Sequence, residues 1–200
     1  MNNKEFVEKL FQALESPTIY GTGAFGAPTG YSNNTERYYE NTKKNIGQKY
    51  ADRIKAAPAG TFIFDCIGLG KGIVWHWSAN PQAKYGGAIY KADDIPDFSI
   101  KSLHKYCEWT ESDCLDPNEI EPGEWLRTSD NKHVAYYVGD GTIIESTTRG
   151  EGKVVRSLLG TREWNGHGKL NYIEYIPESF TIIGEITCPH CGTKIDLFTK

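Results

Sequence analysis

Cys66 stands where a cysteine nucleophile would be expected to act. The short apolar run at residues 61–64 precedes Asp65, and Asp is a favoured N-cap residue, so a helix should begin at Cys66. Unpaired N–H groups at a helix N-terminus carry partial positive charge, which favours the thiolate form of a nearby thiol. We therefore expect the helix end to lower the pKa of Cys66 and to activate it as a nucleophile.

Thiol catalysis also needs an imidazole that accepts and returns a proton, and a polar group that orients the imidazole. His133 opens a predicted strand, and Glu145 lies near the end of the next one. A bare two-residue turn at residues 140–141 would place the two side chains on opposite faces of this hairpin. A three-residue turn, with Gly141 in a bulge, pairs Ala135 with Glu145 and puts Glu145 beside His133. We predict this register.

The elements that must position these residues follow from hydrophobic spacing. Helical spacing predicts helices over residues 3–15 and 34–56 and from residue 66 to about 77, with a Gly-rich loop at residues 20–31. Turn signals dominate residues 80–123 and predict long loops with one short helix near residues 99–106. Alternating patterns then predict strands at residues 125–126, 133–138, 142–146 and 172–176. Helices followed by strands indicate an α+β domain.

Composition excludes several classes of protein. The chain has 200 residues with 22 Lys and Arg against 26 Asp and Glu, a formal net charge of -4, which disfavours a nucleic-acid partner. No apolar run is long enough for a membrane span, and the start of the chain lacks the pattern of a signal peptide. Five cysteines without a leader favour reduced thiols over a disulfide framework.

Several ordered blocks of the chain resemble the NlpC-type cell-wall cysteine peptidases, papain-like enzymes that cut peptidoglycan stem peptides. The first block is Phe-Asp-Cys-Ile-Gly-Leu at residues 64–69, and the second comprises residues 121–124 and 133–146. Residues 164–175 are similar to the closing segment of a subgroup common among bacteriophage endolysins. The ordered set is more specific than any one block.

The resemblance implies a papain-like fold with N-terminal helices packed on an antiparallel sheet. It implies catalytic roles for Cys66, His133 and Glu145, where well-known members have His in the third position. It also suggests substrate-binding roles for Tyr20, Asp65 and His167. His167, between two glycines, is in addition the rival candidate for the third catalytic role.

The resemblance covers residues 5–176. We accordingly assign residues 1–180 to one catalytic domain, with a loop-rich insertion at about residues 80–120, and residues 181–200 to a short tail. The expected reaction is cleavage of an amide bond in the stem peptide, as an endopeptidase or an N-acetylmuramoyl-L-alanine amidase, without a catalytic cofactor. The expected partner is bacterial peptidoglycan, reached after release from the cytoplasm of the producing cell. An acyltransferase of the same superfamily and a non-catalytic wall-binding or zinc-dependent interaction module are the alternatives.

The tail carries a Cys-x-x-Cys turn, Cys188 and Cys191, followed by glycine. Two such thiolates can supply half of a tetrahedral structural zinc site. The other ligands would come from His190, from Cys107 and Cys114, or from a second chain. The alternative is a redox-active tail without metal, and the oligomeric state stays open.

Overall fold

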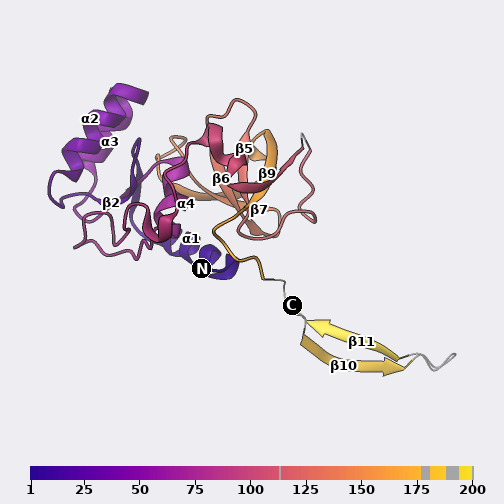
Figure 1. Cartoon of the computed structure of the whole chain (residues 1–200). Helices are drawn as coiled ribbons and strands as arrows, with labels where there is room; N and C mark the ends of the chain where they lie inside the picture. Colours follow the sequence, from indigo (N-terminus) through magenta and orange to yellow (C-terminus); the bar gives the residue numbers. More distant parts are fainter. Residues whose placement is uncertain (113, 177–180, 188–193, 200) are drawn as a thin grey trace.

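The computed structural model describes residues 1–112, 114–176, 181–187 and 194–199 (Figure 1). Its longer helices are α1 (Asn3–Glu15), α2 (Asn34–Ile46), α3 (Gln48–Ala56) and α4 (Cys66–Val74). Short 3-10 helices are η1 (Ala92–Asp94), η2 (Ile100–Lys105) and η3 (Leu159–Thr161). No helix in the described part of the chain combines the length and the apolar character of a membrane span.

Most strands belong to a six-stranded antiparallel sheet in the order β4-β9-β5-β6-β7-β8. Its strands are β4 (Cys107–Glu111), β5 (Trp125–Thr128), β6 (Val134–Gly139), β7 (Thr142–Ser146), β8 (Val154–Leu158) and β9 (Trp164–Leu170). A smaller sheet, in the order β1-β3-β2, contains β1 (Thr18–Tyr20), β2 (Phe25–Pro28) and β3 (Phe62–Phe64).

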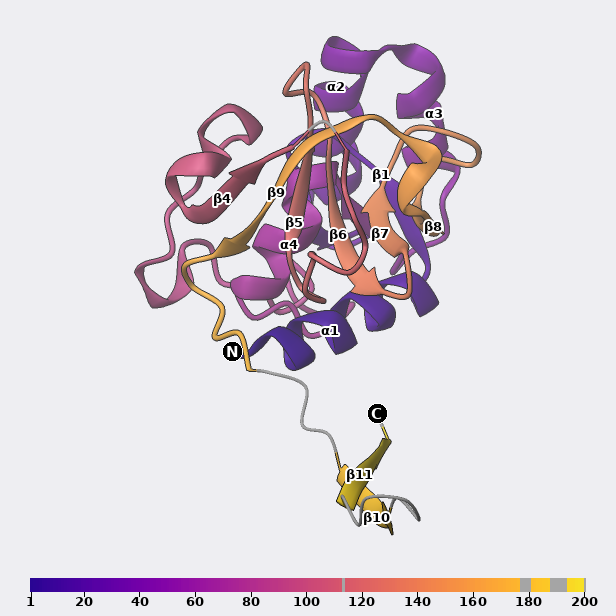
Figure 2. The same cartoon turned by 90° about the vertical axis from the view of Figure 1, so that its right-hand side faces the viewer.

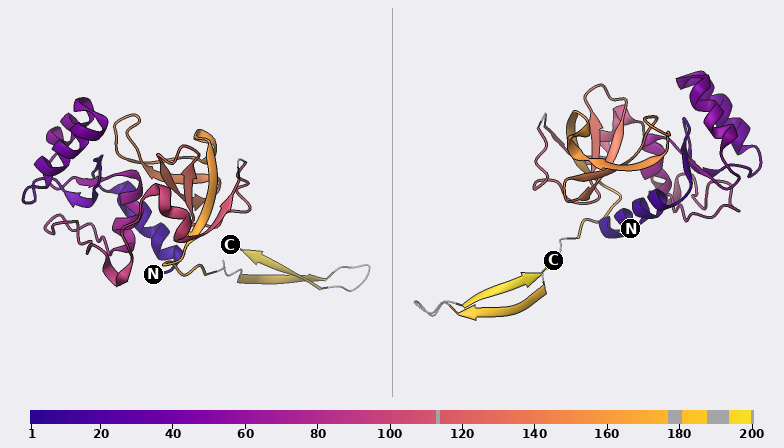
Figure 3. Two further views of the ribbon diagram at one scale, coloured as in Figure 1. Left: turned by 45° about the horizontal axis from the view of Figure 1, so that its top comes forward. Right: turned by 180° about the vertical axis from the view of Figure 1, so that it is seen from behind.

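Helices α1 and α4 cover one face of the six-stranded sheet (Figure 2). Their buried apolar side chains, such as Phe6 and Leu69, share a core with Trp125 and Tyr136 of the sheet. A second core, which includes Leu126 and Tyr137, fills the opposite face, as expected from the alternation of side chains along a strand. Helix α4 lies between the sheet and the α2–α3 pair (Figure 3). The predicted α+β class, with N-terminal helices on an antiparallel sheet, is confirmed.

Several predicted elements differ from the observed ones. The helix predicted over residues 34–56 is broken at Gly47, whose φ of 109° does not fit a right-handed helix. Strand β4 lies in the region predicted to be loops, and β8 was not predicted. The strand predicted at residues 172–176 is wrong, because the chain pairs earlier, as β9, and residues 171–173 form a turn. The Gly-rich loop at residues 20–31 contains β2.

The tail contains a two-stranded antiparallel hairpin of β10 (Thr181–Thr187) and β11 (Lys194–Thr199). The pair of Thr187 with Lys194 brackets residues 188–193. Cys188 and Cys191 therefore lie outside the described residues. The division into a catalytic domain and a tail stays a prediction.

Helix α4 is docked on the sheet by Tyr136 of β6. The Tyr136 hydroxyl donates to the Cys66 carbonyl at 2.7 Å and accepts from the Gly70 N–H at 2.8 Å. These two backbone groups are spaced to bond each other in a helical turn, so the hydroxyl joins the first turn of α4 to the sheet. A β-carbon at Gly70 would come within 2.5 Å of the Tyr136 ring, so glycine is required for this close approach.

We expect Tyr136→Phe to lower the free energy of unfolding by about 1–3 kcal/mol, because it removes two buried hydrogen bonds between α4 and the sheet, each worth about 0.5–1.5 kcal/mol. Chemical denaturation monitored by circular dichroism measures this loss. Tyr50→Phe is the matched control, since the Tyr50 hydroxyl makes no hydrogen bond to any described residue. Equal stability of the two variants would show that the Tyr136 hydroxyl does not hold α4 on the sheet.

Candidate active site

Asp65 is the single residue between β3 and helix α4, and it caps the helix. Its backbone is extended (φ -94°, ψ 179°), and its carboxylate accepts hydrogen bonds from the N–H groups of Gly68 and Gly23, each at 2.6 Å. The predicted N-cap is therefore confirmed, and Cys66 is the first residue of the helix. The Gly23 contact also fixes the Gly-rich loop beside the helix end.

The Cys66 side chain lies at the junction of the smaller sheet, helix α4 and strand β6. The residue is 4% exposed. Its sulfur contacts the Tyr20 hydroxyl and the N–H groups of Ile67 and Val134. Val134 follows His133 directly, so the start of β6 lies against the thiol.

The expected lowering of the Cys66 pKa is wrong. Burial, followed by the nearby Asp65 carboxylate, raises the pKa of Cys66 to about 12, although the N–H groups of Val134 and Ile67 act in the opposite direction. Burial penalises the charged form more than the helix end stabilises it. Cys66 is thus a neutral thiol near pH 7 in this arrangement, and a base must remove its proton before it can attack.

His133 is held at the start of β6 by backbone contacts with Thr128. The His133 carbonyl accepts from the Thr128 N–H, and the His133 N–H donates to the Thr128 hydroxyl, both at 3.1 Å. The His133 ring atom Nε2 bonds to Oε2 of Glu145. A carboxylate can only accept, so the proton of this bond is on Nε2, and in the neutral ring Nδ1 then keeps a lone pair. His133 is thereby prepared to accept a proton at Nδ1.

The predicted register of the hairpin is confirmed. Tyr136 lies opposite Ile144, which places Ala135 opposite Glu145 and Glu145 diagonally across from His133. The position of the bulge differs from the prediction. The irregularity falls between Tyr137 and Gly139, and the turn itself contains two residues, 140 and 141, with φ of 50° and 65°. Two positive φ angles are those of a type I′ turn.

Glu145 is buried and held from two sides. Its Oε2 also accepts from Nε of Arg162 at 2.8 Å, and its Oε1 lies 3.4 Å from the Ser157 hydroxyl. Burial alone would raise the pKa of the Glu145 carboxyl, but the hydrogen bond from His133 and the charges of His133 and Arg162 outweigh it and hold the pKa below its ordinary value. Glu145 is therefore ionised when it contacts His133.

Tyr20 ends β1, where it pairs with Phe64 of the parallel strand β3. Burial, followed by the charge of a Cys66 thiolate, raises the pKa of the Tyr20 hydroxyl. The hydroxyl therefore keeps its proton and can donate it to sulfur. Pairing with β3 brings Tyr20 beside the thiol from a segment 46 residues earlier in the chain.

His167 is placed elsewhere in the sheet. It lies in β9 opposite Leu126, whereas His133 is on the other side of β5, beside Thr128. The His167 ring is buried and its Nδ1 lies 2.5 Å from Oε2 of Glu124, which is also buried. The structure brings Glu145, and not His167, to His133.

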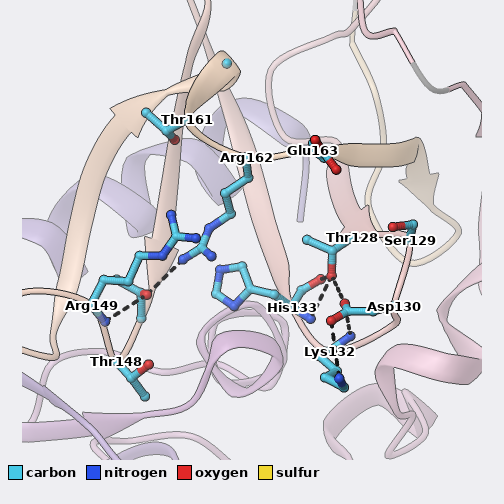
Figure 4. A pocket seen from close by; sticks show the side chains of 12 residues that line it. Thr128, Ser129, Asp130, Lys132, His133, Thr148, Arg149, Thr161, Arg162 and Glu163 are labelled. Carbon is cyan, nitrogen blue, oxygen red and sulfur yellow. Dashed lines mark hydrogen bonds and ion pairs between the residues drawn. The ribbon is translucent and has the colours of Figure 1, made fainter.

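A polar cavity of about 720 Å³ opens beside His133 (Figure 4). Figure 4 shows Arg162 extending toward His133 from one side of the cavity, next to Arg149. The loops before β6, after β7 and before β9 form its wall, with these residues: Thr128, Ser129, Asp130, Lys132, His133, Thr147, Thr148, Arg149, Gly160, Thr161, Arg162 and Glu163. A second cavity, of about 310 Å³, lies beside Asp65 and Gly23.

Sequence reasoning did not find Arg162. The residue lies between η3 and β9 in a segment without a periodic pattern, and no spacing rule connects it to Glu145, 17 residues earlier. Only the pairing of β7 with β8, followed by the return of the chain into β9, brings the two side chains together.

No protein-family model matches the chain, and no curated protein matches it. Among solved structures, the chain is similar to the peptidoglycan hydrolase RipB from Mycobacterium tuberculosis (20% identity, TM-score 0.46, covering 87% of this chain and 68% of that one). It is also similar to the P60 domain of an antigen from M. avium subspecies paratuberculosis (17%, TM-score 0.46, 86% and 96%) and to NlpC2 from Trichomonas vaginalis (16%, TM-score 0.39, 84% and 46%). These likenesses are distant, so the function must be derived from the geometry of the site itself.

Proposed function

We propose that the chain is a cysteine hydrolase that cleaves an amide bond of peptidoglycan stem peptides. The contact between His133 Nε2 and the ionised Glu145 carries this proposal, because it leaves His133 Nδ1 free to accept a proton. His133 stands at the start of β6, where the next residue, Val134, contacts the Cys66 sulfur. A buried thiol at a helix start, an imidazole and an orienting carboxylate are the parts that thiol-dependent acyl transfer requires. The sequence blocks that resemble NlpC-type peptidases specify the substrate class.

In the first half of the reaction, the Cys66 thiol transfers its proton to Nδ1 of His133 as sulfur attacks the amide carbonyl. The oxyanion that forms is placed near the Cys66 N–H in the first turn of α4, a donor that faces the Tyr20 hydroxyl when no substrate is bound. The carbon–nitrogen bond then breaks, His133 returns the proton to the leaving amine, and the acyl group stays on Cys66 as a thioester.

In the second half, water attacks the thioester while His133 removes a proton from the water molecule. The thioester bond breaks, His133 protonates the Cys66 sulfur, and the product is a free carboxylic acid. Glu145 stays ionised throughout and stabilises the imidazolium that forms twice in the cycle. The neutral Tyr20 hydroxyl donates to the Cys66 sulfur between turnovers. The loop that contacts Asp65 would hold the acyl side of the substrate.

The test is mass spectrometry of fragments released from purified peptidoglycan. Hydrolysis should produce one new amine and one new carboxylic acid at a single stem-peptide bond, with the mass of one water added. A new lactyl acid next to muramic acid identifies an amidase, and a new acid inside the peptide identifies an endopeptidase. Products joined to an added amine would indicate an acyltransferase instead, and intact peptidoglycan would reject the proposal.

We also propose that the protein acts on the wall after leaving the cytoplasm of the cell that makes it, as a lytic enzyme. The expected result is that wall cleavage occurs when the purified protein is added to susceptible cells from outside. Failure to cleave whole cells, with retained cleavage of purified peptidoglycan, would reject the lytic role and leave the reaction intact.

We propose in addition that Cys188 and Cys191 hold a structural zinc ion. Cys107 is buried in β4, Cys114 is exposed, and within the described ranges no three His, Cys, Asp or Glu side chains are grouped as a metal site. We take a second chain as the source of the missing thiolates, with His190 and the pair of Cys107 and Cys114 as the alternatives.

Elemental analysis of protein purified without chelator should find about one zinc per two chains. Cys188→Ser should lose the metal, whereas Cys114→Ser should keep it. Removal of zinc should leave wall cleavage unchanged, since no step of the reaction uses a metal. Protein that contains no zinc would reject the site.

A further inference from the structure

Arg162 makes two directed contacts next to the pair of His133 and Glu145. Its Nε donates to Oε2 of Glu145 at 2.8 Å, and its Nη2 donates to the Thr147 hydroxyl at 2.9 Å. Thr147 follows the last residue of β7, so both contacts lie at the same end of this strand. The Arg162 side chain is 11% exposed and the Glu145 side chain 4%. The pair is therefore largely withdrawn from water.

Arg162 and His133 share one oxygen of Glu145. Both donate to Oε2, while Oε1 has only the Ser157 hydroxyl at 3.4 Å. A carboxylate held by one donor can rotate about its terminal bond, but a second donor on the same oxygen fixes that oxygen in place. Charge-assisted hydrogen bonds are the stronger kind in proteins. Arg162 thus determines where Oε2 is presented to His133.

The charges around Glu145 form a chain of alternating sign when His133 is protonated: imidazolium, carboxylate and guanidinium. Other charged groups on the surrounding loops are Asp130, Lys132, Arg149 and Glu163. Of the charged groups among the described residues, His133 and Arg162 contact the Glu145 carboxylate. Without Arg162, the buried carboxylate would have His133 as its remaining charged partner.

We propose that Arg162 is a positioning residue that acts through Glu145 to hold His133 in the orientation needed for proton transfer with Cys66. The expected effect of Arg162 on catalysis rests on the proposed function, whereas its contacts with Glu145 and Thr147 do not. Arg162 keeps Glu145 ionised, so the proton stays on His133 and does not move to the carboxylate. It also balances the charge of the buried Glu145 carboxylate.

The test compares Arg162→Gln and Arg162→Lys with the control Arg156→Gln. Arg156 lies on β8 and donates from two of its nitrogens to the Thr142 hydroxyl, at the other end of β7. The control therefore removes an arginine whose side chain contacts the same strand at Thr142, three residues before Glu145. Steady-state cleavage of a soluble stem peptide gives kcat and KM, and circular dichroism confirms folding of each variant.

We expect Arg162→Gln to lower kcat roughly 10- to 100-fold, the range seen when supporting residues around a site are lost, with KM changed far less. The acid limb of the pH profile should move to higher pH, because Glu145 loses one of the charges that keep it ionised. Arg162→Lys should restore part of kcat and most of the acid limb, since it keeps the charge but not the fork of donors. Arg156→Gln should match the wild type.

A substrate-free readout separates this inference from the proposed function. The rate of Cys66 alkylation by iodoacetamide, followed against pH by peptide mapping, depends on proton removal by His133 and needs no peptidoglycan. Arg162→Gln should shift the acid limb of this rate profile upward even if the wild-type protein cuts no wall peptide. Unchanged alkylation and pH profiles in Arg162→Gln would overturn the inference, and so would a fall in kcat at an unchanged acid limb. Should Arg162→Gln fail to fold, Arg162→Lys decides. A partly lowered kcat with an acid limb close to that of the wild type upholds the inference, and a wild-type kcat overturns it, because the fork of donors would then be dispensable.

Discussion

Replacing Cys66 with alanine should abolish cleavage of peptidoglycan, by at least a thousandfold, while the protein remains folded. Loss of a nucleophile in a hydrolase of this kind removes the covalent route and leaves only the weak rate due to binding and oxyanion stabilisation. The loss of turbidity of a suspension of susceptible cell walls measures the activity. Removal of one small side-chain atom should shift the unfolding midpoint by only a few degrees.

Cys114→Ala is the matched control for this experiment, because Cys114 is an exposed free thiol. It should lyse walls at the wild-type rate. Lysis by Cys66→Ala at the wild-type rate would assign the chemistry to a different residue.

The second large effect is expected at Glu145. Glu145→Ala should lower kcat roughly a hundredfold or more, because it leaves both His133 and Arg162 without their shared acceptor in a buried setting. Glu145→Gln should keep more activity. Arg162 can only donate, so it selects the amide oxygen, and not the NH₂ group, for the position of Oε2, and that oxygen can still accept from His133.

The dependence of kcat on pH should show whether the negative charge of Glu145 supports activity. The pKa of Glu145 lies below its ordinary value in the folded protein, so its contribution to activity and stability is present above the unfolded pKa and lost as the pH falls through the folded pKa. Glu145→Gln has no group to titrate and should lack this acid loss. Parallel profiles of kcat against pH measure the difference.

His167→Gln is the control for Glu145, because an amide can still bond to Glu124. It should have a mild effect on kcat. An inactive His167→Gln together with a normal Glu145→Ala would give the third role to His167 and contradict the pairing seen in the structure.

Local sequence rules were sufficient for the parts of the site that lie close together in the chain. The N-cap at Asp65 follows from residue type next to an apolar run, and the register of the β6–β7 hairpin follows from the need to place His133 and Glu145 on one face. The bulge lies between Tyr137 and Gly139 and not at Gly141 as predicted. Residues 140 and 141 already complete a favourable two-residue turn, because their types permit positive φ.

The rest required the tertiary structure. The direction of the Cys66 pKa depends on how completely Tyr20 and the start of β6 cover the sulfur, and a helix pattern does not contain that burial. Arg162 reaches Glu145 only through the order of strands in the sheet. The strand expected at residues 172–176 was displaced to β9 because the Gly-rich run there permits close pairing with β4, where a β-carbon at Gly166 would come within 2.5 Å of the Thr110 carbonyl oxygen.

The central claim is that the reaction passes through an acyl group on the Cys66 sulfur, and interception by hydroxylamine tests it most directly. Hydroxylamine attacks thioesters, so its addition during turnover of a purified stem peptide should divert the acyl fragment from the free acid to the hydroxamate. The amine fragment should still be released, and mass spectrometry should find both acyl products with the wild-type protein and neither with Cys66→Ala. Release of the free acid alone, at every hydroxylamine concentration, would contradict a thioester on Cys66.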